Sequence, residues 1–231
     1  MELIDMFIND EKLRDYKVSI VSRPDIPTTQ KNIEYVTIPG RDGSLTRFKG
    51  YMDKTITVSF GIKGKRSCLN SKYRQLTALF YSAKTIRFTD DKQVFYKVKN
   101  VVIGDMAKEL RMFGKFDVQF ILDPFTYIDN DLITLTGNTT IYNQGTYESR
   151  PEIRIYGTGD VTVTINGRAF TVKNLNGYVD INSELFRCFK GTVNKNNDMI
   201  GEFPVFDVGE NEIVLSSNIS KLEITPNWRY L

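Results

Sequence analysis

The stretch TITVSFGI at residues 55–62 places an apolar side chain at every second position. Successive side chains of a β-strand point to opposite faces, so this period predicts a strand with one buried and one polar face. The stretch KFDVQFIL at residues 115–122 has the same period. The predicted buried positions of the two strands are Ile56, Val58, Phe60, Ile62, Phe116, Val118, Phe120 and Leu122. Two such strands indicate a first half built around a β-sheet.

One strong helical pattern lies between these two strands. Apolar residues recur there at spacings of three and four, namely Leu69, Tyr73, Leu76, Leu79 and Phe80. This spacing places them on one face of an α-helix. Weaker strand patterns occur at 18–21, 35–38, 85–88 and 94–102. Residues 1–130 are therefore predicted to form an α+β domain with one helix.

The helical period disappears after a polar segment at residues 126–138, and short strand patterns follow one another through 131–231. Asn166-Gly167 lies between two of them and predicts a hairpin, because both central residues of a type I′ turn need positive φ. Asn176-Gly177 predicts a second turn. Further strands are expected at 178–181, 203–208, 212–215 and 222–224. The second half is predicted to be an all-β sandwich, and the fold class of the chain is mainly β.

Composition removes most catalytic chemistry. The chain has 231 residues, of which 41% are hydrophobic and 26% charged, which is typical of a folded globular protein. It contains no histidine, the usual general base and the commonest metal ligand. Its two cysteines, Cys68 and Cys188, form no C-x-x-C motif. No cofactor and no metal site are expected. The first residues lack the basic start of a secretory signal, and no apolar run is long enough to cross a membrane, so we expect no membrane association.

A set of short motifs spread over nearly the whole chain gives a more specific indication. The first half contains TIPGRDGSL at 37–45 and FILDPF at 120–125. The second contains NQGT at 143–146, SRPEI at 149–153, ING at 165–167, GEFP at 201–204, GEN at 209–211 and PNWR at 226–229. In this order and spacing, the chain resembles the distal tail protein (Dit) family of siphoviruses that infect Gram-positive bacteria.

The resemblance implies a non-enzymatic virion protein at the distal tip of a long non-contractile tail, assembled in the host cytoplasm. It implies a ring, usually of six copies, whose N-terminal domain surrounds a channel that DNA later traverses without specific binding. It also implies that the C-terminal sandwich is galectin-like or similar to a carbohydrate-binding module. The expected partners are the tail tube protein, the tape measure protein, the tail-associated tip protein and, in some phages, receptor-binding baseplate proteins.

Two segments are candidate contact sites. Gly40, Arg41, Asp42, Gly43 and Ser44 form a candidate subunit-interface loop, because the glycines permit tight turns and the two charged side chains can bond to a neighbour. The competing interpretation is a hairpin tip exposed to water. Trp228 and Arg229 are candidates for docking the C-terminal segment, either onto the protein's own body or onto a neighbour.

Two other function classes stay open. A carbohydrate-binding adhesin would act through the C-terminal sandwich. A glycoside hydrolase would need only two carboxylates at a suitable separation, and Asp180 with Glu184, or Glu210 with Glu212, are the candidate pairs. The structural ring subunit is the favoured function because of the family resemblance.

Overall fold

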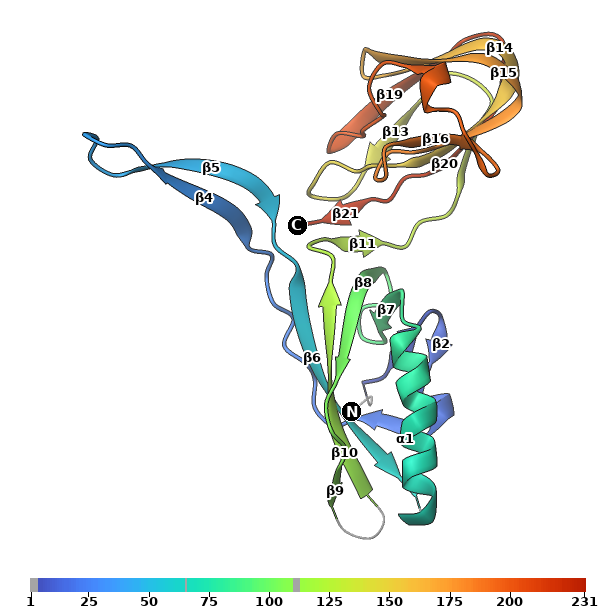
Figure 1. The fold of residues 1–231 in the computed structure, drawn as a ribbon. Helices are drawn as coiled ribbons and strands as arrows, with labels where there is room; N and C mark the ends of the chain where they lie inside the picture. The colour runs from blue at the N-terminus through green and yellow to red at the C-terminus, as the bar shows by residue number, and fades with distance from the viewer. Residues whose placement is uncertain (1–3, 65, 110–112) are drawn as a thin grey trace. The chain divides into compact units, whose positions relative to one another are not determined.

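The computed structural model describes residues 4–64, 66–109 and 113–231 (Figure 1). The chain divides into two compact units, unit 1 up to Thr126 and unit 2 from Tyr127 to Tyr230, with Leu231 counted in the first. Each unit has its own hydrophobic core. Residues 127–130, which the sequence analysis placed in the first half, therefore belong to unit 2.

Unit 1 is built on an antiparallel sheet with the strand order β2-β1-β7-β8-β10-β6-β3. The strands are β1 (Met6–Ile8), β2 (Glu11–Lys12), β3 (Val18–Ile20), β6 (Lys54–Lys63), β7 (Thr85–Phe88), β8 (Val94–Ile103) and β10 (Phe113–Leu122). A further short strand, β9 (Ala107–Glu109), pairs with β10, and a 3-10 turn, η1 (Leu13–Tyr16), follows β2. The central pair is β6 and β10, in which Phe60 lies opposite Phe116. All eight predicted inward positions of this pair are buried, which confirms the alternating pattern.

The helix α1 (Arg66–Tyr81) packs against this sheet. Its residues Leu69, Leu76 and Phe80 are buried, as the spacing predicted. The Phe80 ring lies 5.0 Å from the ring of Phe60 and 6.0 Å from that of Phe116, between centroids. Each fully buried large apolar side chain contributes roughly 1.5–3 kcal/mol to folding, so this aromatic cluster is a main stabilising feature of unit 1.

A two-stranded hairpin, which we call the arm, forms a sheet of its own in unit 1. It consists of β4 (Lys31–Thr37) and β5 (Ser44–Tyr51), and Figure 1 shows it in blue, running away from β6. Only its first strand was expected from the sequence, over residues 35–38. The second strand carries no alternating burial, because nearly all of its side chains are exposed.

Unit 2 is all-β apart from one 3-10 turn, η2 (Asn196–Asp198). Its strands are β12 (Ile133–Leu135), β13 (Thr139–Asn143), β14 (Glu152–Ile165), β15 (Arg168–Asn182), β16 (Arg187–Lys190), β17 (Val193–Asn194), β18 (Met199–Ile200), β19 (Gly209–Leu215), β20 (Ile219–Thr225) and β21 (Arg229–Tyr230). One more strand, β11 (Thr126–Ile128), pairs with β21. The mainly β fold with one α-helix is thereby confirmed for the described residues.

The long hairpin of β14 and β15 organises unit 2. A register shift between Gly159 and Val161 divides β14, so that its first part pairs with β20 and its last residues pair with β19. The predicted turn at Asn166-Gly167 joins the two strands, with φ of 50° and 77°, as a type I′ turn requires. The side chains that the hairpin buries, including Ile155 and Val163, pack with Phe206 and Trp228 in the second core.

Two predictions for the second half are wrong. Asn176-Gly177 is not a turn, because both residues lie inside β15 opposite Thr158 and Gly157, so residues 178–181 continue the same strand. Positive φ at Gly177 is accommodated there within the ladder, next to the register shift. Residues 203–208 form no strand and make only an isolated bridge, between Phe206 and Ser149. The pyrrolidine nitrogen of Pro204 lacks the hydrogen that a strand ladder needs.

Candidate functional site

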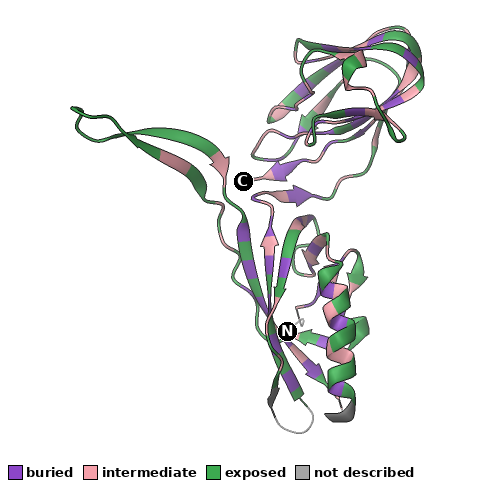
Figure 2. Cartoon of the chain, in the orientation of Figure 1, coloured by how far each residue is buried: buried purple, intermediate pink, exposed green. Residues whose placement is uncertain are grey.

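The predicted interface loop lies at the tip of the arm. Residues 38–43 connect β4 to β5, Ser44 begins β5, and all of residues 40–44 are exposed (Figure 2). Gly40 and Gly43 have φ of 83° and 73°, values that L side chains rarely adopt, which explains the two glycines. The backbone N–H of Arg41 donates to the carbonyl of Ile38 at 3.2 Å and closes the turn. In the single chain, the loop is the tip of a hairpin. Its contact with a neighbouring subunit stays a prediction.

One face of the arm is apolar and open. Ile33 lies opposite Phe48, and Tyr35 lies opposite Thr46 on the same face. The side chains of Tyr35 and Phe48 are 66% and 52% exposed. On the opposite face, Glu34 forms an ion pair with Lys49 at 2.9 Å. The arm therefore presents one face with the exposed rings of Tyr35 and Phe48, and a mixed face where the exposed Val36 and Leu45 lie beside the Glu34–Lys49 pair.

The base of the arm is anchored to unit 1. The Tyr51 ring lies 5.2 Å from that of Phe48 and 5.8 Å from that of Phe125. The hydroxyl of Thr29 donates to the carbonyl of Pro124 at 2.6 Å. Lys99 forms an ion pair with Asp53, just after the arm, at 2.6 Å. These contacts fix where the arm begins but leave its outer part, including the tip, without tertiary packing among the described residues.

Trp228 and Arg229 lie within unit 2 and dock onto it. Trp228 is 3% exposed, and its ring lies 5.3 Å from that of Phe206. The Arg229 side chain donates from Nε to the carbonyl of Glu148 at 2.7 Å. A Cβ on Gly145 would lie 2.3 Å from the Arg229 carbonyl oxygen, so only glycine fits beside this segment. In a single chain, this segment packs on the protein's own body.

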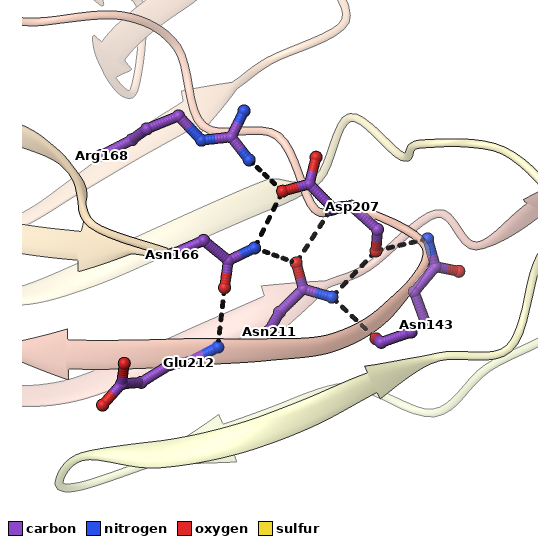
Figure 3. A network of polar contacts seen from close by, with 7 residues as sticks. Asn143, Asn166, Arg168, Asp207, Asn211 and Glu212 are labelled. Carbon is purple, nitrogen blue, oxygen red and sulfur yellow. Dashed lines mark hydrogen bonds and ion pairs between the residues drawn. The ribbon is translucent and has the colours of Figure 1, made fainter.

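A buried amide network holds the loop before β19, and the sequence analysis did not find it (Figure 3). Asn211, which is fully buried, donates to the carbonyls of Asp207 and Gly209 at 2.9 Å each and accepts from the Asp207 N–H at 2.8 Å. Asn166 donates to Asn211 Oδ1 at 2.8 Å and to the Asp207 carboxylate at 3.0 Å. That carboxylate also pairs with Arg168. The network ties the hairpin turn to the loop.

The carboxylate pairs considered for hydrolysis have other partners or lie open to solvent. Asp180 accepts two hydrogen bonds from Arg154, at 2.6 and 3.1 Å, and Glu184 accepts from the Tyr127 hydroxyl at 3.5 Å. Glu210 and Glu212 are both exposed on β19. A hydrogen bond from Lys221 lowers the pKa of Glu223, whereas a glycosidase acid needs a raised pKa.

Within residues 4–64, 66–109 and 113–231, no three histidine, cysteine, aspartate or glutamate side chains gather as a metal ion would require. In the same described ranges, no helix combines the length and the apolar character of a membrane span. Neither observation adds a candidate site to those already described.

Comparisons with known proteins find similarity to phage tail and baseplate proteins. Residues 11–122 match the family model described as phage tail protein RIFT-related domain. The fold is similar to that of the Dit protein of phage SPP1, described as a paradigm of the hub adsorption apparatus in phages infecting Gram-positive bacteria. That match has a TM-score of 0.68 and 16% identity and covers 100% of both chains. A search of curated proteins found no match.

Two structures of the phage P2 baseplate in its activated conformation are also similar. The structure with calcium has a TM-score of 0.57 and the structure with strontium 0.54, each at 13% identity over 96% of both chains. The family model spans β2 through β10, and the structural matches extend the similarity through unit 2. Residues 11–122 therefore match the model of phage tail protein RIFT-related domains, and the chain as a whole has the fold of the SPP1 Dit protein.

Proposed function

We propose that this chain is a structural subunit of the hub at the distal end of a siphophage tail, linking the tail tube to the host-adhesion device. The observation that carries the proposal is the fold shared with the SPP1 Dit protein over the full length of both chains. The hub acts without catalysis, in the virion. Its proposed partners are the tail tube, tape measure and tip proteins, together with receptor-binding baseplate proteins where the phage has them.

Unit 1 is the proposed ring-forming part, and the proposed ring has six copies around a channel for DNA. A closed ring needs two different surfaces on each subunit that fit one another. The arm supports this assignment, because an isolated two-stranded hairpin is at best marginally stable in water. Its exposed Tyr35 and Phe48 lose contact with water only if another surface covers them. In the proposed ring, that surface is unit 1 of the next copy.

The loop at residues 40–44 would reach furthest into the neighbour. No ion pair with Arg41 or Asp42 occurs among the described residues of the chain, so both charges are available to bond across an interface. Charge-assisted hydrogen bonds of this kind add orientation as well as energy. The alternative, a water-exposed tip, predicts that the loop contributes nothing to assembly.

Native mass spectrometry of the full chain, with negative-stain images, tests the proposal. The expected result is a closed oligomer with a central hole. Tyr35→Ser should shift the population to monomer, whereas Tyr142→Ser should not. Tyr142 is a matched control, because it is also 66% exposed but lies on β13 in unit 2. A strict monomer at every protein concentration, also when mixed with purified tail tube protein, would contradict the proposed ring.

A further inference from the structure

A small pocket in unit 2 is lined by most of the lysines of that unit. Its volume is about 100 Å³. Unit 2 contains four lysines, and Lys173, Lys190 and Lys195 line the pocket, whereas Lys221 does not. The unit as a whole is acidic, because residues 127–230 hold thirteen Asp and Glu against nine Lys and Arg. The pocket therefore concentrates positive charge on a unit whose net charge is negative.

One wall of the pocket is a β-bulge in β15. The register shift between Gly159 and Val161 leaves two residues of β15, Lys173 and Asn174, opposite the single residue Asp160. Asn174 has φ of 52°, and its backbone N–H donates to Asp160 Oδ1 at 2.9 Å. A bulge re-aims side chains relative to the regular alternation of a strand. At this bulge, Lys173 and Asn174 both line the pocket.

The other two ammonium groups are held in place by the protein itself. Lys190, the last residue of β16, donates from Nζ to the Asn176 carbonyl at 2.6 Å. Lys195 donates from Nζ to the carboxylate of Asp198 in η2 at 2.8 Å. An ammonium group has three N–H donors, so these bonds leave two on each lysine for a ligand. Because the side chains are already ordered, a ligand loses less entropy in binding to them.

The charges of the lining favour an anion. Three ammonium groups line the pocket together with one carboxylate, that of Asp198, which is paired with Lys195. In the described parts of the chain, neither Lys173 nor Lys190 has a carboxylate partner. A cationic ligand would be repelled by these two charges, and an anionic ligand would supply the missing counter-charge.

Among anions, a phosphate group fits the number of donors. Its several oxygens are strong acceptors and share a charge of about −1 to −2, whereas a carboxylate has two oxygens and a single charge. Lysine binds phosphate as a compact point charge. One water molecule needs roughly 10–15 Å³ of a cavity, so this pocket has room for a small ion but not for an extended ligand. The buried Leu175 and Val179 complete the lining, and partial burial reduces the screening of the attraction.

We propose that this pocket binds a phosphate group, with Lys173, Lys190 and Lys195 donating to its oxygens. Free phosphate and the phosphodiester of a larger molecule present the same tetrahedral oxyanion, and the experiment below distinguishes them. The site lies within unit 2 and does not rest on the ring proposed for unit 1.

Phosphorus NMR of two small probes with the full chain tests this, because a bound probe acquires the fast transverse relaxation of the protein. The probes are inorganic phosphate and dimethyl phosphate, at millimolar concentration and low ionic strength, where charges are least screened. The expected result is line broadening of at least one probe. Broadening of inorganic phosphate alone identifies a site for free or terminal phosphate, and broadening of dimethyl phosphate identifies a phosphodiester site.

The lysines of the pocket are tested by substitutions that keep an unbranched side chain and remove the charge. Lys173→Met and, separately, Lys190→Met should each weaken the affinity of the probe roughly 5-fold, because each removes one charge-assisted hydrogen bond. Lys173 is exposed and forms no ion pair within the described residues, so its variant should fold normally. Lys221→Met is the matched control, since it removes the same charge from the same unit outside the pocket, and it should leave the affinity unchanged.

Thermal melts of all variants verify folding. A lack of broadening for both probes overturns the proposal, as does an affinity that neither pocket variant lowers. An affinity that Lys221→Met lowers as much as the pocket variants do would also overturn it, because it would indicate attraction by the overall charge. None of these results alters the native mass of the protein, so failure of the ring proposal would be recognised separately.

Discussion

The Trp228 ring packs against the Phe206 ring in the core of unit 2, with 5.3 Å between centroids. The two residues come from segments that are not regular strands, and neither is more than 3% exposed. Beside this pair, the carbonyl of Trp228 accepts from the Ile128 N–H at 2.8 Å. This hydrogen bond joins the beginning of unit 2 to its last segment.

Trp228→Ala should destabilise unit 2 by about 3–5 kcal/mol, because it removes the packing of a large buried ring and leaves a cavity. Chemical denaturation followed by far-UV circular dichroism measures this. Trp228→Phe, which keeps an aromatic ring at the site, is the control and should cost less. Equal and small losses for both variants would mean that the ring contributes little to the core.

Asn211→Ala should cost roughly 2–4 kcal/mol, because it removes the bonds of the buried amide to the Asp207 N–H and to the carbonyls of Asp207 and Gly209, of which the Asp207 carbonyl keeps its bond from Asn143. The same denaturation experiment measures the loss. Glu210→Ala, at the exposed neighbouring position, should change the unfolding free energy by less than about 0.5 kcal/mol. If the two variants behaved alike, the network would not be a stabilising feature.

Arg41→Ala should weaken the oligomer more than it lowers the stability of the monomer. The residue is exposed at the tip of the arm, where substitutions usually change folding stability by less than about 0.5 kcal/mol. Native mass spectrometry over a dilution series reports the oligomer, and thermal melts at low concentration report the monomer. Equal effects in both measurements would assign the loop a purely structural role.

The two cysteines should differ in reactivity. Burial raises the pKa of the Cys188 thiol to about 11, whereas Cys68 is exposed. Because the thiolate is the reactive form, Cys188 should resist iodoacetamide at pH 8 in the folded protein, and Cys68 should react. Peptide mass spectrometry before and after unfolding in urea measures both sites. Rapid labelling of Cys188 in the native protein would contradict its buried position.

The Glu223 carboxylate should make stability depend on pH at the acid end. Its folded pKa lies below the unfolded value, chiefly because Lys221 donates to it. Its stabilising contribution is therefore present above the unfolded pKa and is lost as pH falls through the folded pKa. The difference in melting temperature between the protein and Glu223→Gln should be constant near pH 7 and shrink below about pH 4. A difference that does not change with pH would contradict this linkage.

The sequence predicted the elements whose periodicity reflects a single buried face. The alternating runs at β6 and β10 and the helix α1 are of this kind, and all three are confirmed. The turn at Asn166-Gly167 was predictable because its backbone needs positive φ at both positions. The same dipeptide at 176–177 led to a wrong turn prediction. The pairing of β15 with β14 continues through it and overrides the local preference for a turn.

The candidate surfaces were much less accessible to sequence reasoning. The arm strand β5 has no buried face, so it lacks the alternation that identifies a strand. Arg154, Asp180 and Glu223 come from three different strands. Only the pairing register of β14 with β15 and β20 places Arg154 between the other two. No local pattern in the sequence encodes that register.

The pairing of β6 with β10 also bears on the order in which strands come together during folding. Val58 lies opposite Val118, so the central ladder of unit 1 forms only after a loop containing α1, β7 and β8 has closed. The hairpin of β14 and β15 instead grows outward from a two-residue turn at Asn166-Gly167. Local pairing forms early and long-range pairing late, because closing a long loop costs chain entropy before its contacts are gained. In refolding, the β14–β15 hairpin should therefore form before the β6–β10 ladder, which pulse-labelling hydrogen exchange would show as earlier protection of Val163 than of Val58.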